Sequence, residues 1–228
     1  MKLMTWNVGL VSDLFRKVMC IFERKDVSIK GICSRIIKEN PDIVALQEIY
    51  DNDFELIYDE LKELYPYTIH KSSLGLCFLS KPKLNYEYKI IFPRDKLSSC
   101  LRTNNGVIVA REENTRNFFC NTHLSCGIGY EYEYHYINTV RIVHKNDNLV
   151  MCGDFNAFRN YNYNKICKLL EIKNNHKNTY CSYDHPLLKC NFDYIVKFKE
   201  EEVKGDELYS DCIIDKTSDH YPLISNID

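Results

Sequence analysis

Short apolar runs that end in a turn or a polar residue recur along the chain and predict many short β-strands. Residues 149–152 form one such buried run, and Gly153 permits a tight turn directly after it. Residues 106–111 and 117–123 predict neighbouring strands joined by a polar turn. The same pattern predicts strands over residues 2–8, 42–46, 67–70, 76–80, 86–92, 192–198, 208–214 and 221–227.

Two further segments have apolar residues at helical spacing. Residues 28–40 predict an amphipathic helix with Ser28 as its N-cap and Pro41 as its stop. Residues 53–64 predict a second helix, and weaker helical patterns cover residues 10–22, 130–144 and 163–170. Many strands with helices inserted in both halves favour two packed sheets covered by helices.

Length and composition place the chain among ordinary globular proteins. Its 228 residues, without a visible repeat or linker, predict a single domain over 1–228 with a sizeable core. Hydrophobic residues make up 45% and charged residues 27% of the sequence. A net charge of −2 gives no general attraction to polyanions, so any contact with nucleic acid must come from a local patch.

The cysteines and the lengths of the apolar runs indicate the cellular compartment in which the protein is expected. The 11 cysteines are scattered without a CxxC pair, which argues against a zinc module. Several of them, such as Cys77, stand inside apolar runs, where cysteine behaves as a small hydrophobe. No signal core opens the chain and no apolar run is long enough to span a membrane. We expect a cytoplasmic monomer without stable membrane insertion, and a nuclear location stays open.

Polar residues at the ends of the predicted strands are the candidates for chemistry. Asp154 and Asn156 follow the strand over 149–152, near the carboxyl end where α/β folds usually place their sites. One carboxylate and one amide can orient a water molecule and bind a phosphoryl oxygen without filling the site with like charge. Taken alone, a strand that ends in Gly-Asp is more often followed by a plain turn.

Five other motifs strengthen the functional interpretation. Asn7 ends the first predicted strand, and Glu48 follows the second. His123 ends the strand over 117–123, and Asp193 stands at the start of the strand over 192–198. Asp219 and His220 come just before the last predicted strand. Each is more often structural when taken singly. Together they are what a magnesium-dependent phosphoester hydrolase requires, because Mg²⁺ prefers carboxylate and amide oxygens. The attacking water needs an acceptor, and the charge developing at phosphorus needs histidine and asparagine donors.

In this order the six motifs resemble the endonuclease/exonuclease/phosphatase superfamily, from Thr5 to Pro222. The superfamily includes deoxyribonucleases, apurinic endonucleases, tyrosyl-DNA phosphodiesterases, neutral sphingomyelinases, deadenylases and inositol-polyphosphate 5-phosphatases. The resemblance implies an α/β fold, a four-layer α-β-β-α sandwich of two packed mixed sheets flanked by helices. The site should lie at one edge of the two sheets.

The resemblance also implies a role for each matched residue. Glu48 is the principal Mg²⁺ ligand, with Mn²⁺ as a substitute ion, and Asn7 lies beside it as a ligand or a substrate contact. Asp219 completes the metal side directly or through water. Asp154 orients or deprotonates the attacking water, and Asn156 helps to hold the water and the phosphate.

Two histidines complete the implied site. His220 donates to a phosphate oxygen and is oriented by Asp193. His123 is a second phosphate donor or the acid for the leaving group. Apurinic endonucleases lack a histidine at the matching position, so that branch is disfavoured.

The chain departs from the family pattern at two places. Residues 73–76 offer no acidic partner for His123, which weakens its assignment as a general acid. Many members have a basic residue shortly before the Asp193 position, and here Asn191 and Phe192 intervene. Arg102 is either the substitute phosphate contact or a plain loop charge. Four tyrosines after His123 could stack bases, line a lipid-facing rim or form an exposed strand edge; they are Tyr130, Tyr132, Tyr134 and Tyr136.

The leading functional interpretation is hydrolysis of phosphodiester bonds in nucleic acid, by a nuclease or an enzyme that processes tyrosyl-DNA ends. The competing enzyme hypothesis is hydrolysis of a phospholipid head group, as in sphingomyelin, or of a phosphoinositide. A third hypothesis is a catalytically dead binding module on the same fold. The complete set of polar residues argues against the third, and the sequence leaves the substrate open.

Overall fold

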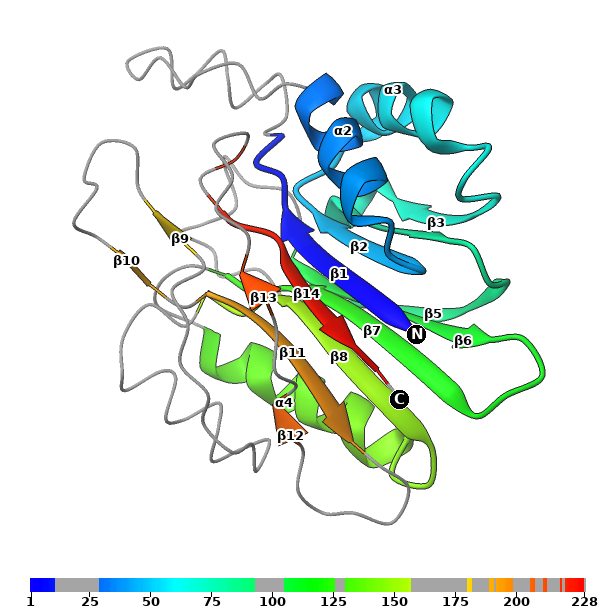
Figure 1. The fold of residues 1–228 in the computed structure, drawn as a ribbon. Helices are drawn as coiled ribbons and strands as arrows, with labels where there is room; N and C mark the ends of the chain where they lie inside the picture. Colours follow the sequence, from blue (N-terminus) through cyan, green and yellow to red (C-terminus); the bar gives the residue numbers. More distant parts are fainter. Residues whose placement is uncertain are drawn as a thin grey trace.

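The computed structural model describes residues 1–10, 29–92, 105–125, 130–156, 180–181, 189–190, 192–198, 206–207, 211–212, 218 and 220–227. Two six-stranded sheets pack face to face between outer helices (Figure 1). Helices α2 (Ile29–Glu39) and α3 (Asp51–Leu61) cover the first sheet, and α4 (Tyr130–Val143) covers the second. This is the four-layer α-β-β-α sandwich that the sequence predicts.

The first sheet has the strand order β13-β14-β1-β2-β4-β3. Strands β1 and β2 run parallel, and every other pair of neighbours in this sheet is antiparallel. The bounds are β13 (Asp211–Cys212), β14 (Leu223–Asn226), β1 (Lys2–Asn7), β2 (Ile43–Gln47), β4 (Leu76–Ser80) and β3 (Tyr67–Lys71), with a 3₁₀ turn at Ser72–Leu74 between β3 and β4.

The second sheet has the order β12-β11-β8-β7-β6-β5 and repeats this plan, because β7 and β8 are its one parallel pair. A separate two-stranded pair joins β9 to β10. The bounds are β12 (Asp206–Glu207), β11 (Asp193–Phe198), β8 (Asn148–Asp154), β7 (Asn117–His123), β6 (Gly106–Glu112), β5 (Leu84–Ile91), β9 (Tyr180–Cys181) and β10 (Lys189–Cys190).

Alternation along the central strands directs one set of side chains to the helices and the other to the facing sheet. On β1, Met4 and Trp6 pack against α2 and α3, whereas Leu3 enters the core between the sheets. On β8, Leu149 and Met151 face α4, whereas Val150 and Cys152 face the first sheet. A slip of one residue would exchange the two sets, so burial on both faces fixes the register.

The inward faces change from apolar to polar toward one end of the sandwich. Along β1 the sequence is Leu3, Thr5, Asn7; along β2 it is Ile43, Ala45, Gln47; along β7 it is Phe119, Asn121, His123; and along β8 it is Val150, Cys152, Asp154. The apolar half belongs to the core between the sheets. The polar half therefore gathers at the carboxyl ends of the two parallel strand pairs, as expected for an α/β site.

Most predicted elements are confirmed with ends displaced by a few residues. Of the strand predicted over 208–214, residues 211–212 form β13, which pairs with β14, and the rest of that range lies outside the described residues. The helices predicted over 10–22 and 163–170 lie outside the described residues.

Four cysteines in the described part of the chain are buried free thiols, namely Cys33, Cys77, Cys120 and Cys152. They pack as small apolar side chains, as their positions in apolar runs predict. Burial raises the pKa of the Cys77 and Cys152 thiols to about 12, which keeps both protonated. Among the described helices, none is long and apolar enough to cross a membrane.

Candidate active site

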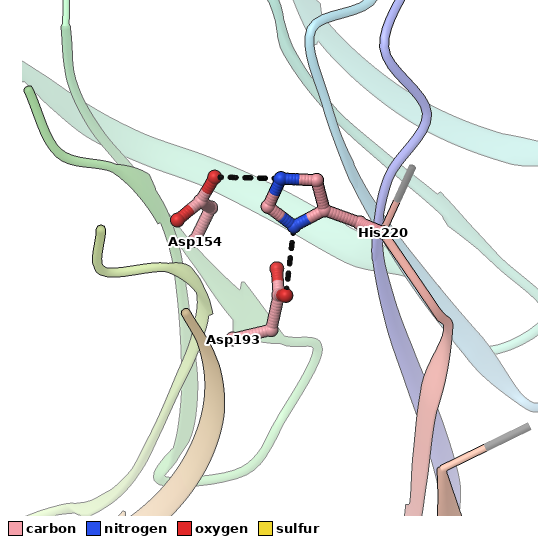
Figure 2. A group of neighbouring side chains, drawn as sticks. All are labelled: Asp154, Asp193 and His220. Carbon is pink, nitrogen blue, oxygen red and sulfur yellow. Dashed lines mark hydrogen bonds and ion pairs between the residues drawn. The ribbon is translucent and has the colours of Figure 1, made fainter. Parts of the chain in front are cut away.

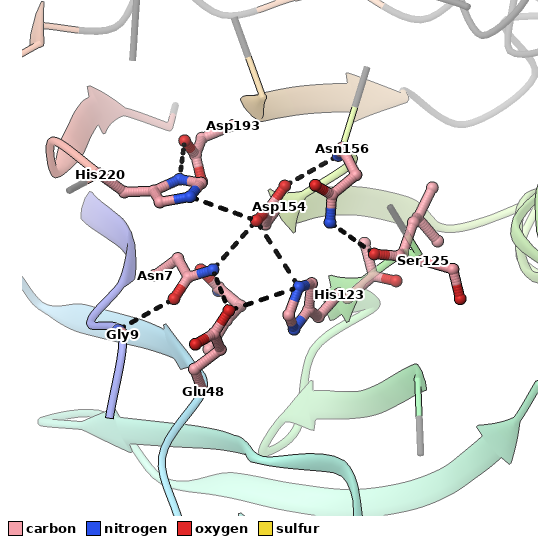
Figure 3. Close-up of polar contacts among 12 residues, drawn as sticks. Asn7, Gly9, Glu48, His123, Ser125, Asp154, Asn156, Asp193 and His220 are labelled. Atoms are coloured by element: carbon pink, nitrogen blue, oxygen red, sulfur yellow. Dashed lines mark hydrogen bonds and ion pairs between the residues drawn. The ribbon is translucent and has the colours of Figure 1, made fainter. Parts of the chain in front are cut away.

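Seven predicted site residues in the described part of the chain meet at the polar end of the two sheets (Figure 3). The first sheet supplies Asn7 and Glu48 from the ends of β1 and β2, and the second supplies His123 and Asp154 from the ends of β7 and β8. The antiparallel strand β11 brings its first residue, Asp193, to the same end. His220 lies just before β14 in the chain, and Asn156 lies two residues after Asp154.

The carboxylate of Asp154 lies at the centre of this group. Its Oδ2 accepts a hydrogen bond from Nδ2 of Asn7 at 3.0 Å. The same oxygen lies 3.6 Å from Nε2 of His123 and 3.7 Å from Nε2 of His220. Its Oδ1 accepts the backbone N–H of Asn156 at 2.8 Å. One buried carboxylate therefore faces an amide and two imidazoles.

Burial raises the pKa of Asp154 to about 6, and the nearby negative charge of Asp193 acts in the same direction. The imidazoles of His220 and His123 and the hydrogen bond from Asn7 oppose this rise. Asp154 is 1% exposed, so desolvation is the dominant cause. A carboxylate with a pKa near neutrality is a stronger base than a solvated one, and such shifts mark candidate catalytic groups.

The backbone around the site adopts conformations that most residues avoid. Gly153 has φ 135°, and a Cβ there would meet the backbone oxygen of Thr122 at 2.0 Å. Only glycine therefore lets β7 and β8 approach each other directly before Asp154. Glu48 and Asn156 have φ 56° and 47°, in the left-handed region that costs a side-chain-bearing residue about 1–2 kcal/mol. Such strain clusters at functional sites.

His220 is held by a carboxylate on one side of its ring (Figure 2). Its Nδ1 lies 2.8 Å from Oδ2 of Asp193, and both side chains are buried. A carboxylate at Nδ1 keeps a proton on that nitrogen and directs Nε2 toward Asp154. Asp193 is therefore placed to orient His220, and the predicted pair of side chains is in contact.

Further hydrogen bonds hold the backbone of His220. Its N–H donates to Oγ of Ser218 at 3.2 Å, and its carbonyl accepts Nε1 of Trp6 at 3.0 Å. The hydroxyl of Ser218 donates in turn to the carbonyl of Asn7 at 2.8 Å. The segment before β14 is thus tied to β1, and the imidazole is held from both its ring and its backbone.

Glu48 occupies the more open side of the site, with 24% of its side chain exposed against 2% for Asp154. Its Oε1 accepts Nδ2 of Asn7 at 3.1 Å and lies 3.9 Å from Nε2 of His123. Within the described residues Oε2 has no hydrogen-bond partner. The Oδ1 atom of Asn7 accepts the backbone N–H of Gly9 at 3.0 Å, so the amide nitrogen is the group that faces the carboxylates.

Two groups of side chains in the described residues could hold a metal ion. The ligand atoms of Asp154, Asp193 and His220 lie within 4.8 Å of one another. In that group Nδ1 of the histidine is already hydrogen-bonded to Asp193, and a nitrogen ligand does not suit Mg²⁺. The unpartnered, partly exposed oxygen of Glu48 suits a hard cation that keeps several waters. Glu48 therefore fits Mg²⁺ better, while Asn7 lies beside it with its amide nitrogen bonded to the carboxylate.

The segment after β7 is fixed on both sides of its chain. The backbone N–H of Leu124 donates to the carbonyl of Asp154 at 2.9 Å, and its carbonyl accepts Nδ2 of Asn156 at 2.6 Å. The backbone N–H and the hydroxyl of Ser125 donate to the carboxylate of Glu133 at 2.6 and 2.5 Å. These contacts limit the movement of His123. Its Nε2 faces the carboxylates of Asp154 and Glu48, so the site itself supplies acidic neighbours that residues 73–76 lack.

Glu133 is a residue near the site that the sequence interpretation missed. It is 5% exposed, and burial raises its pKa, whereas the hydrogen bonds from Ser125 and the charge of His123 lower it. A sequence signal does exist, because Glu133 shares helical spacing with the buried Ile137 and Val140. An acidic residue at a core position of an amphipathic helix indicates a specific polar partner.

Several predicted site features remain untested by the structure. Asp219 and Arg102 lie outside the described residues, as do the side chains of Tyr130 and Tyr132, and their roles stay predictions. The other two tyrosines of that cluster pack against the core beneath α4, since Tyr134 is 2% exposed and the ring of Tyr136 lies 5.6 Å from that of Phe92. These two tyrosines belong to a helix and to the core, and they do not form an exposed strand edge.

The sequence model of the Endonuclease/Exonuclease/phosphatase family matches residues 4–220. The chain belongs to this family. Members of the family are generally hydrolases that act on phosphoesters. Among curated proteins, the sequence finds no match.

Solved structures of this family share the fold over the whole chain. A variant of beta toxin from Staphylococcus aureus with bound magnesium ions superposes with a TM-score of 0.74 at 17% identity, covering 98% of each chain. Sphingomyelinase C from Streptomyces griseocarneus gives 0.68 at 16% identity, covering 99% of this chain and 98% of that one. Truncated TDP2 from Caenorhabditis elegans gives 0.62 at 17%, covering 98% and 95%. At these identities the similarity establishes the fold alone.

Proposed function

We propose that this family member is a Mg²⁺-dependent phosphodiesterase that hydrolyses its substrate by direct attack of water. One observation carries the proposal: the buried carboxylate of Asp154 faces both His123 and His220 and shares the amide of Asn7 with Glu48. A base, two donors and a carboxylate suited to a cation are thereby gathered within one small volume. A plain structural network has no need of such an arrangement.

The metal would be held by Glu48, with Asn7 beside it and Asp219 as the remaining predicted ligand. When bound, a divalent ion polarises a phosphoryl oxygen and offsets the negative charge that develops on it. The unpartnered oxygen of Glu48 supports this assignment. The bound magnesium ions in the structurally similar beta toxin variant support the choice of ion, and we expect Mn²⁺ to substitute.

Asp154 acts as the base that takes a proton from the attacking water. Its raised pKa makes it a better acceptor than a solvated aspartate. The amide nitrogen of Asn156 is engaged with the carbonyl of Leu124, which leaves the Oδ1 of Asn156 to accept a hydrogen bond from the same water. The two side chains then orient the water from two directions.

The histidines stabilise the phosphate. The carboxylate of Asp193 at 2.8 Å favours the imidazolium form of His220, whose Nε2 can then donate to a phosphoryl oxygen. Nε2 of His123 lies 3.6 Å from Oδ2 of Asp154 and 3.9 Å from Oε1 of Glu48. We assign His123 to the second phosphate oxygen or to the departing oxygen atom.

We retain nucleic acid as the leading substrate class, although the histidine at position 123 is shared by the deoxyribonuclease, tyrosyl-DNA and sphingomyelinase branches and does not separate them. One observation favours a second class, a phospholipid head group. Sphingomyelinase C superposes on this chain with a TM-score of 0.68, above the 0.62 of truncated TDP2. Both substrate classes present a phosphodiester to the same groups.

A substrate panel tests the proposal. Purified protein is incubated with single-stranded DNA, duplex DNA, RNA, a 5′-tyrosyl oligonucleotide, sphingomyelin vesicles and a phosphoinositide, each with Mg²⁺, with Mn²⁺ and with a chelator. We expect hydrolysis of one class that the chelator abolishes, and no hydrolysis by the Asp154→Asn control. If every substrate stays intact with both metals, the proposal is wrong and the binding-module hypothesis replaces it.

A further inference from the structure

Two buried side-chain amides join the two sheets directly beneath the site. Gln47 is the last residue of β2 in the first sheet, and Asn121 lies on the inward face of β7 in the second. Both residues are 0% exposed. Nε2 of Gln47 donates to Oδ1 of Asn121 at 2.7 Å, so the two sheets are connected by a direct side-chain hydrogen bond.

Asn121 uses both of its amide donors and its amide oxygen in hydrogen bonds across this interface. Besides accepting from Gln47, its Nδ2 donates to the carbonyls of Leu46 at 3.0 Å and Cys77 at 2.9 Å. These carbonyls belong to the neighbouring strands β2 and β4 of the first sheet. One side chain of the second sheet is therefore anchored to two strands and one side chain of the first.

Gln47 extends the connection within its own sheet. Its Nε2 also lies 3.0 Å from Oγ1 of Thr5 on β1. The backbone carbonyl of Gln47 accepts the N–H of Val8 at 3.1 Å, directly after Asn7. The bridge thus reaches the strand that carries Asn7 as well as the strand that leads to Glu48.

Below the bridge and the site residues themselves, the interface offers little directional restraint. The core between the sheets consists of apolar side chains, and apolar contact fixes area without fixing direction. Hydrogen bonds between amides require short distances and near-linear geometry. Since the site takes Asn7 and Glu48 from one sheet and His123 and Asp154 from the other, sliding of the sheets would separate them.

We propose that Gln47 and Asn121 are positioning residues that set Glu48 against His123 and Asp154. In the sequence, Gln47 comes one residue before Glu48, and Asn121 comes two residues before His123. Across the site, Oε1 of Glu48 lies 3.9 Å from Nε2 of His123. The catalytic part of this inference rests on the proposed hydrolytic function. Its geometric part concerns the protein alone.

The test uses Gln47→Met, Asn121→Leu and the double variant, with Phe119→Leu as the matched control. Met and Leu resemble the amides in size and shape but cannot form the bridge. Phe119 also faces the first sheet from β7, two residues before Asn121, so its truncation destabilises the same interface away from the site. Turnover is measured with bis(4-nitrophenyl) phosphate and Mg²⁺, stability by urea unfolding, and geometry by the imidazole NMR signals of His123.

Each single variant should lower kcat by on the order of 10- to 100-fold with little change in KM, because displacement of reacting groups by about 1 Å can cost that much. Gln47→Met leaves Oδ1 of Asn121 without its donor, and Asn121→Leu removes one acceptor from Nε2 of Gln47, whereas the double variant removes both ends of the bridge. We therefore expect the double variant to be more stable than the sum of the single losses predicts, while its kcat stays low. Phe119→Leu should lose stability and keep kcat.

The NMR measurement tests the geometric role of the two amides independently of their effect on catalysis. The signals of His123 should shift in the amide variants, while those of His144 at the far end of the second sheet should not. A double variant with wild-type kcat, or unshifted His123 signals in all amide variants, would overturn the positioning role. If the wild-type protein hydrolyses nothing, the proposed function fails, and the NMR signals still decide the geometric claim.

Discussion

Replacement of Asp193 by asparagine is the sharpest test of the site chemistry. The substitution keeps the size of the side chain but removes the charge that faces Nδ1 of His220 at 2.8 Å. The new amide can face the ring with its nitrogen, which would force the imidazole to carry its proton on Nε2 and accept at Nδ1. It can also face the ring with its oxygen, which keeps the tautomer but no longer favours the imidazolium.

The size of the effect follows from the burial of the pair. Side-chain exposure is 8% for His220 and 0% for Asp193, so solvent screens their interaction weakly. A hydrogen bond to a charged group contributes about 1.5–3 kcal/mol, which corresponds to roughly 10- to 150-fold in rate. Loss of the correct protonation state adds to this, and removal of a positioned acid or donor typically costs about 10²- to 10⁴-fold. We expect kcat/KM to fall within that higher range.

The assay compares Asp193→Asn, His220→Ala and the double variant in kcat/KM across pH on the same phosphodiester. Because the two side chains act as a unit, the double variant should be little slower than His220→Ala alone. Urea unfolding serves as the control for stability. Multiplicative losses in the double variant, with an unchanged pH–rate profile, would refute the pairing and leave Asp193 as a structural residue at the start of β11.

Four further predictions address the metal, the base, the loop and the substrate. Glu48→Gln should lose roughly 10³-fold in rate at saturating Mg²⁺ with unchanged unfolding, and near wild-type hydrolysis would refute the metal assignment. The pKa of Asp154 is raised to about 6, so the rate should fall below that pH as the base becomes protonated. The stability that protonated Asp154 confers should be lost as pH rises through about 6. Asp154→Asn should remove this pH dependence of stability, as measured by urea unfolding of the metal-free protein. Glu133→Gln should lower kcat about 10-fold by loosening Ser125, and Ser125→Ala should share most of that loss if the two residues form one contact. If nucleic acid is the substrate, the apparent KM for an oligonucleotide should rise with salt at a log–log slope of about 0.7–0.9 per neutralised phosphate, while bis(4-nitrophenyl) phosphate should respond weakly.

The positions of the main site residues could be predicted because each stands where an apolar run meets a polar residue. Asp154 follows a buried run and a glycine, and His123 ends a strand whose partner was also visible in the sequence. Local patterns of this kind identify strand ends, and the rules of α/β folds then bring those ends together.

Other features depend on contacts between distant elements and have no local signal. Gln47 and Asn121 are 74 residues apart, and neither stands out from an ordinary buried strand residue until the sheets are packed. The short strands β12 and β13 likewise belong to different sheets because they pair with β11 and β14. Glu133 was detectable only as an acidic residue at a core position of a helix.

The central strand β1 lies between β2, which follows it closely in the chain, and β14, which forms more than 200 positions later. Trp6 and His220 are 214 residues apart and joined by a hydrogen bond, and Asn7 and Ser218 are joined across 211. Pairings over such separations form late in folding. During synthesis on the ribosome, one edge of β1 therefore stays without its partner until residues 223–226 have emerged, and the growing chain needs protection from aggregation there. The proposed hydrolysis cannot begin before that moment, so a nascent chain stalled upstream of His220 should be inactive however well its first sheet has formed.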